Sequence, residues 1–131
     1  MEQTSPRDLK VSRFQSTGII KYINKWIIVE CDDDLARYYR KQLNQKALTP
    51  PPFGSHITVV AGDYETPTRP EFWNKYVDQA IEFEYEPQIL SLDRYHWVTV
   101  YCEKLLDIRE ELGLNRNLKW PLHLTVAKSL V

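Results

Sequence analysis

Two short segments of the chain carry the same chemically useful residues. HITV covers residues 56–59 and HLTV covers residues 123–126, and each contains a His, a Thr two positions later and apolar residues between and after them. Two of the three histidines of the chain lie in these two segments. Side chains alternate between the two faces of a β-strand. We therefore expect each His–Thr pair on an open face of its strand, with the apolar residues facing a core.

Two histidines on strand faces that meet across one cleft suit the cleavage of a phosphodiester. One imidazole can take a proton from the attacking hydroxyl and the other can give a proton to the leaving oxygen, because the histidine pKa of about 6.5 allows both states near neutral pH. Threonine hydroxyls can donate to the phosphoryl oxygens, where negative charge develops. The candidate catalytic residues are His56, Thr58, His123 and Thr125. The spacing leaves open which His is the base.

Each copy also has simpler interpretations. A His and a Thr in one strand are individually ordinary, and a single copy would more often be structural. A metal site would need more ligands than one His per strand, and no Asp, Glu or Cys lies beside either motif to complete a set. We therefore expect no metal and no cofactor. The doubling of the motif favours the catalytic interpretation.

The segments that precede the motifs are also duplicated. WIIVEC at residues 26–31 is similar to WVTVYC at residues 97–102, and each is followed by a predicted helix, a loop containing proline and a His-x-Thr strand. Repeated units of this kind are usually structural. The order predicts an α+β fold of two pseudo-symmetric antiparallel-sheet lobes with flanking helices around a central cleft. Both His–Thr pairs would then line that cleft.

Periodicity and turn residues predict the remaining elements. A hairpin is expected over residues 18–31, with helices over 32–45, 71–80 and 103–113, and strands over 56–61, 81–87, 88–92, 96–102 and 122–127. Asp32 is placed to cap the first helix, Pro70 to open the second and Gly113 to end the third. Residues 1–13 are polar and are expected to form a loose arm, with residues 14–131 as a single domain.

Several aromatic residues are candidates for binding a nucleotide. Strand alternation places Trp97 and Tyr101 on the face expected to carry the motifs, and Tyr22 lies in the first hairpin. Aromatic rings stack on nucleobases, so these three residues are the predicted substrate-binding residues. The alternative is that they only cover a sheet face. His96 has no Thr two positions later and is interpreted as structural or surface.

Composition limits the partners of this chain. Its 131 residues carry a formal net charge of −1, with a sequence pI of about 6.3. Proteins that bind long DNA or RNA usually present a broad basic face, so a small nucleotide is the favoured ligand. We expect no membrane segment, because no stretch is long and apolar enough. Two cysteines that match no disulfide or zinc pattern favour a cytoplasmic location.

The paired motifs resemble the signature of the 2H phosphoesterase superfamily, and the similarity extends over residues 18–127. The resemblance implies two sheet lobes around a cleft, two His as acid and base, and two Thr that bind the phosphate. Within the superfamily the chain looks most like the phage anti-CBASS phosphodiesterases, through GSHITVV after a proline-rich loop, LGLNRN followed by WPLHLTVA, and an early hairpin with a Tyr. These enzymes degrade the cyclic di- and trinucleotide messengers that bacteria make on infection.

This resemblance implies a metal-independent phosphodiesterase that hydrolyses 3′,5′ linkages of small cyclic oligonucleotides. It would be a phage protein that acts in the host bacterial cytoplasm and evades CBASS immunity. Two alternatives remain: an enzyme acting on 2′,3′-cyclic phosphates or RNA ends, and a non-catalytic module that sequesters a nucleotide. The residues do not decide between water and a ribose 2′-hydroxyl as nucleophile. They also leave the base preference and the oligomeric state open.

Overall fold

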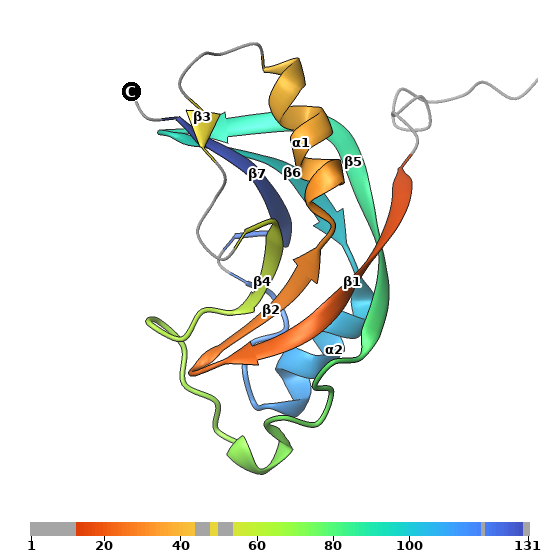
Figure 1. Ribbon diagram of the computed structural model, residues 1–131. Helices are drawn as coiled ribbons and strands as arrows, with labels where there is room; N and C mark the ends of the chain where they lie inside the picture. The colour runs from red at the N-terminus through yellow and green to blue at the C-terminus, as the bar shows by residue number, and fades with distance from the viewer. Residues whose placement is uncertain (1–12, 44–47, 50–53, 119, 130–131) are drawn as a thin grey trace, which may run out of the picture.

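The computed structural model describes residues 13–43, 48–49, 54–118 and 120–129 (Figure 1). Apart from Arg13, the predicted N-terminal arm lies outside the described residues. The elements follow in the order β1 (Phe14–Ile23), β2 (Trp26–Cys31), α1 (Asp33–Gln42), β3 (Leu48–Thr49), β4 (His56–Val60), η2 (Pro70–Phe72), β5 (Ala80–Leu92), β6 (Tyr95–Tyr101), α2 (Glu103–Glu111) and β7 (His123–Ser129). Among the described residues, no helix has the length and apolar character needed to cross a membrane.

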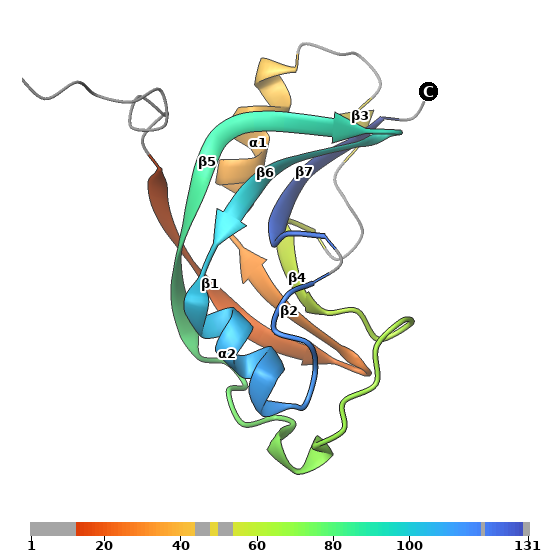
Figure 2. The same cartoon turned by 180° about the vertical axis from the view of Figure 1, so that it is seen from behind.

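The described strands form one closed antiparallel sheet, and not two lobes. The hydrogen-bonded order is β7-β4-β2-β1-β5-β6, and β6 pairs with β7 to close a six-stranded barrel; the short β3 pairs with β7 beside this seam. The predicted α+β fold with two pseudo-symmetric lobes around a cleft is therefore wrong. Both strand–helix–strand units exist, but the last strand of the second unit, β7, hydrogen-bonds to β4 of the first, so the two units share a single sheet (Figure 2).

Local predictions are largely confirmed. The hairpin turns at Asn24, whose φ of 53° is tolerated by Asn, and Ile23 pairs with Trp26 across it. The carboxylate of Asp32 accepts the Asp34 amide at 2.9 Å and caps α1, as predicted. Gly113 follows α2 with a φ of 80°, the left-handed conformation that ends many helices and that glycine adopts without steric cost.

Two segments differ from their prediction. The helix expected over residues 71–80 is reduced to η2, because Asn74 and Asp78 adopt positive φ values that a helix does not allow. The two strands expected over 81–92 form the single strand β5. Its pairing with β6 is irregular between Tyr85 and Ile89. Pro87, which has no amide hydrogen to donate, lies in that irregular stretch.

The interior of the closed sheet is the hydrophobic core. Alternate residues of β4 and β7 point into it, and Ile57, Val59, Leu124 and Val126 are fully buried. The two helices α1 and α2 contribute further buried side chains from opposite ends of the molecule, including Tyr39 and Leu105 (Figure 1). The opposite face of β4 and β7 is therefore the face on which polar side chains remain accessible.

Candidate active site

The two His-x-Thr motifs lie on adjacent strands of the closed sheet. β4 and β7 run antiparallel, with Ile57 opposite Leu124. Continuing this register by one residue in each direction places His56 opposite Thr125 and Thr58 opposite His123. All four are half-buried on the face opposite the core. The structure thus brings the four predicted catalytic residues together, through strand pairing and not through a cleft between lobes.

Both imidazoles make the same hydrogen bond. His56 Nδ1 lies 2.9 Å from the carbonyl oxygen of Gly54, and His123 Nδ1 lies 2.9 Å from the carbonyl oxygen of Pro121. A carbonyl oxygen can only accept, so Nδ1 carries the hydrogen in each ring. The basic lone pair of each neutral imidazole is therefore on Nε2. Each ring is held in one tautomer by the residue two positions before it.

The backbone before each His is itself fixed. The Ser55 carbonyl accepts the Cys31 amide at 2.8 Å, and the buried Ser55 hydroxyl donates to Asp33 in the first turn of α1 at 3.0 Å. On the other strand, the Leu122 carbonyl accepts the Val100 amide at 2.9 Å. Because the carbonyls that orient the rings belong to these anchored segments, both imidazoles are held from the backbone side.

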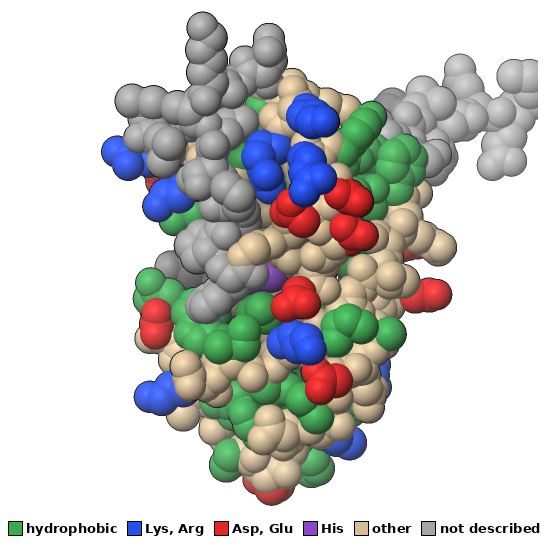
Figure 3. All heavy atoms as spheres, in the orientation of Figure 1, with side chains coloured by type: hydrophobic (Ala, Val, Ile, Leu, Met, Phe, Trp, Pro, Cys, Tyr) green, Lys and Arg blue, Asp and Glu red, His purple; other side chains and the backbone are tan. Residues whose placement is uncertain are grey.

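The two rings also interact electrostatically. Burial and the positive charge of a protonated His123 hold the pKa of His56 below its ordinary value, although the hydrogen bond to the Gly54 carbonyl acts in the opposite direction. A small patch of histidine atoms is visible on this face of the molecule (Figure 3). His56 is accordingly neutral at pH 7, which is the state a general base requires.

The predicted substrate-binding residues are only partly brought to this site. The Trp97 ring lies beside the His123 ring, with 5.9 Å between centroids, and Thr99 stands directly opposite His123 in the β6–β7 pairing. Tyr101 follows Thr99 on the same face of β6. Tyr22 lies elsewhere: its ring packs against Trp73 at 5.2 Å and its hydroxyl accepts the Tyr76 amide. The structure does not bring Tyr22 to the histidines.

The third histidine is part of the packing. His96 is 5% exposed, and its two ring nitrogens lie 2.7 Å from the hydroxyls of Ser91 and Ser129. These contacts agree with the interpretation of His96 as a structural residue.

One charged neighbour of the site, Glu30, was not predicted from the sequence. It stands opposite His56 in the pairing of β2 with β4. A strand's sequence predicts which face a residue occupies but not which strand lies next to it, so no local signal could have found Glu30.

Within the described ranges, no group of three or more His, Cys, Asp or Glu side chains is arranged to hold a metal ion. Comparisons of the chain with models of protein families, with curated proteins and with solved structures find no match.

Proposed function

We propose that this chain is a phosphodiesterase in which His56 and His123 act as an acid–base pair. The observation that supports this most is the matched pair of imidazoles on adjacent strands, each with Nδ1 bound to a backbone carbonyl and Nε2 as its basic atom. A structural histidine has no need for a twin in the same tautomer beside it. The chemistry of this pair requires no metal, since both proton transfers are made by side chains.

The lowered pKa of His56 assigns it the role of base in this proposal. His56 Nε2 takes the proton of the attacking hydroxyl as the new oxygen–phosphorus bond forms. His123 Nε2 gives its proton to the leaving oxygen as the old phosphorus–oxygen bond breaks. The Thr58 and Thr125 hydroxyls donate to the non-bridging phosphoryl oxygens. Attack by a ribose 2′-hydroxyl would leave a 2′,3′-cyclic phosphate end, and attack by water would leave a phosphomonoester.

The proposed substrate is a small cyclic di- or trinucleotide with 3′,5′ linkages. The similarity of the paired motifs to those of the phage anti-CBASS branch of the 2H phosphoesterases supports this choice, although the two-lobed fold that the resemblance implies is not the fold of this chain. Trp97, beside His123, offers a ring for stacking next to the reacting phosphate. With a net charge of −1, the chain lacks the basic excess typical of proteins that hold long nucleic acids. In this proposal the protein disarms a bacterial messenger during phage infection.

The test is incubation of the wild type with 3′,3′-cyclic GMP–AMP in EDTA, followed by chromatography of the products. Linear product is expected from the wild type and from a His96→Asn control, and a loss of about 10²–10⁴ in rate from His56→Ala and His123→Ala. Circular dichroism would establish that each variant is folded. An intact ring with the wild type, together with opening of 2′,3′-cyclic AMP, would move the substrate to 2′,3′-cyclic phosphates. Binding without cleavage of either compound would replace the enzyme by a sequestering module.

A further inference from the structure

Two arginines connect the helices to the strands that carry the motifs. In α1, Arg40 Nε donates to the Val126 carbonyl of β7 at 2.9 Å. In α2, Arg109 Nη1 donates to the Val59 carbonyl of β4 at 2.8 Å. Val126 and Val59 are the last residues of HLTV and HITV. Each arginine therefore binds the carbonyl of the residue that directly follows the threonine of one motif.

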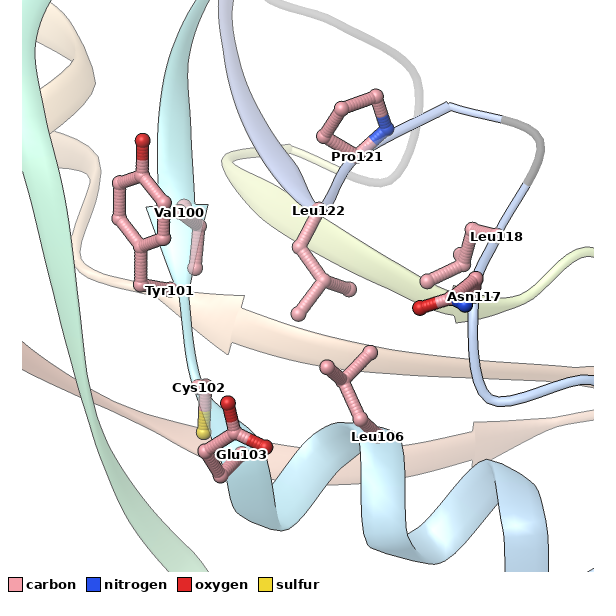
Figure 4. A pocket seen from close by; sticks show the side chains of 9 residues that line it. All are labelled: Val100, Tyr101, Cys102, Glu103, Leu106, Asn117, Leu118, Pro121 and Leu122. Carbon is pink, nitrogen blue, oxygen red and sulfur yellow. The ribbon is translucent and has the colours of Figure 1, made fainter.

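The two contacts cross between the duplicated units. α1 lies between β2 and β4 in the first unit but binds β7 of the second, and α2 lies between β6 and β7 in the second unit but binds β4 of the first. Within the second unit the contact is apolar: Leu106 of α2 and Leu122, directly before β7, point toward each other beside a pocket of about 270 Å³ (Figure 4). This apolar contact stays inside one unit, whereas the arginines join the two.

The motif strands share few hydrogen bonds of their own. Among the residues that the structure describes, β4 and β7 pair at one position, Ile57 with Leu124, whereas β1 and β2 pair at six. A misplacement of about 1 Å in a catalytic group can cost about a hundredfold in rate. The relative position of His56 and His123 therefore depends largely on contacts outside this one pairing.

Both guanidinium groups are themselves held by a carboxylate. Arg109 is 1% exposed and donates to the two oxygens of Glu65, at 2.9 and 2.6 Å. The Arg40 side chain is 16% exposed and lies 3.5 Å from Asp33, which also accepts the Ser55 hydroxyl. Apolar side chains of similar volume often replace buried ion pairs without loss of stability. Stability alone therefore gives little reason for a charged side chain at either position.

We propose that Arg40 and Arg109 are positioning residues that fix the two His-x-Thr motifs relative to each other. Each arginine holds, from the helix of the other unit, the carbonyl beside the threonine that binds the phosphate. The inference rests on the proposed function and adds to it two residues that touch neither the substrate nor the reacting atoms. Because the contacts cross between the units, loss of one arginine should displace one motif strand with respect to the other.

The test is to measure kcat and KM of Arg40→Met and Arg40→Lys for 3′,3′-cyclic GMP–AMP, on protein that circular dichroism shows to be folded. Methionine keeps most of the packing but cannot donate, so kcat should fall about tenfold with little change in KM. Lysine can donate to the Val126 carbonyl and should recover most of the loss. Arg37→Met is the matched control, because the ion pairs of Arg37, with Asp33 and Asp34, stay within α1. An unchanged kcat for Arg40→Met, or an equal loss for Arg37→Met, would overturn the assignment.

The second arginine is tested with Arg109→Met/Glu65→Gln, because a partly buried carboxylate left without its partner would destabilise the fold. This double variant should lose about as much kcat as Arg40→Met does. Glu65→Gln alone keeps the bond from Arg109 to Val59, so it is the control and should retain the wild-type kcat. Wild-type turnover in the folded double variant would overturn the assignment of Arg109.

Amide chemical shifts separate this inference from the proposed function, because they need no turnover. In 15N-labelled protein, Arg40→Met should shift the amide of Thr58 on β4 as well as that of Thr125 on β7, whereas Arg37→Met should shift neither. If the wild type cleaves no phosphodiester but both amides shift, the proposed function fails and the coupling of the motifs by Arg40 stands. If cleavage depends on the two motif histidines while Arg40→Met keeps the wild-type kcat, the positioning role fails alone. Shifts confined to β7 would also contradict it.

Discussion

At the scale of single residues, the site is defined by two imidazoles that donate through Nδ1 to the carbonyl of the residue two positions earlier. The identical contact on Gly54 and Pro121 leaves both reactive nitrogens, the two Nε2 atoms, in the same chemical state. The surroundings of the two rings differ: Glu30 stands opposite His56, whereas Thr99 stands opposite His123 and Trp97 lies beside it. Burial also lowers the pKa of His56, which supports the proposal that it acts as the base.

This assignment predicts an effect of the leaving group on the His123→Ala variant. An ordinary ribose leaving oxygen needs a proton from His123, so the variant should lose about 10²–10⁴ in kcat on a natural diester. A p-nitrophenolate leaves without a proton, so the loss on uridine 3′-(p-nitrophenyl phosphate), which keeps the ribose 2′-hydroxyl beside the phosphate, should be much smaller. The measurement is kcat for both substrates by chromatography and absorbance. His56→Ala, as the comparison, should be slow on both. Equal losses for the two variants on both substrates would show that His123 is not the acid.

At the scale of elements, the buried side chain of Arg109 connects α2 to the rest of the fold. Arg109 is 1% exposed; it donates to the Val59 carbonyl of β4 at 2.8 Å, to the Asn115 carbonyl at 3.0 Å and to both oxygens of Glu65. Burial raises the pKa of Glu65, but hydrogen bonds from Arg109 and from the Ala61 amide outweigh it, and the pKa lies below its ordinary value. This ion pair ties the helix to the end of the strand that carries His56.

Removing this arginine should therefore destabilise the protein strongly. Arg109→Ala leaves two carbonyls and a partly buried carboxylate without their donor, which costs about 3 kcal/mol in the free energy of unfolding. Lys75→Ala is the matched control, because it breaks the ion pair with Glu111 on the surface, where solvent screens the two charges and the pair contributes little to stability. Urea denaturation measures both values. A similar small loss for the two variants would contradict the role given to Arg109.

Most elements could be predicted from the sequence, since their signals are local. Asp32 caps α1 and Gly113 follows α2 where the sequence places them, and strand alternation predicts the face of each His and Thr. The segment 71–80 could not be predicted, since it is held by distant residues: the Tyr76 amide donates to the Tyr22 hydroxyl and the Asp78 amide donates to the Ile20 carbonyl. The Nδ1 partners and the packing of Tyr22 against Trp73 depend on tertiary structure in the same way.

At the scale of the whole molecule, closure of the sheet decides where the motifs lie. Sequence alternation specifies the face of a residue but not the neighbouring strand. The duplicated units suggested two separate sheets, whereas β7 pairs with β4 on one side and with β6 on the other. The first pairing places the two motifs together. The second brings Trp97 and Thr99 to His123.

The closed sheet predicts protection along the β6–β7 seam. The Val100 amide donates to Leu122 at one end of the seam, and the Ser129 amide donates to Arg94 at 2.7 Å at the other. In a closed sheet both amides should exchange with solvent as slowly as those of the β1–β5 pairing, because neither strand is an edge there. Native-state hydrogen exchange followed by NMR measures this. Exchange at the rate of exposed loop amides for both positions would show that the seam is open.

The most direct test of the acid–base pair is the pH dependence of kcat/KM for a cyclic dinucleotide in EDTA. The base must be neutral and the acid protonated, so the wild type should give a bell-shaped profile. Because the pKa of His56 is lowered, activity should fall toward acid only below about pH 6.5, the ordinary histidine value. His56→Ala should remove the acid limb and His123→Ala the alkaline limb. A flat profile between pH 5 and 9, or limbs that survive both substitutions, would contradict the account.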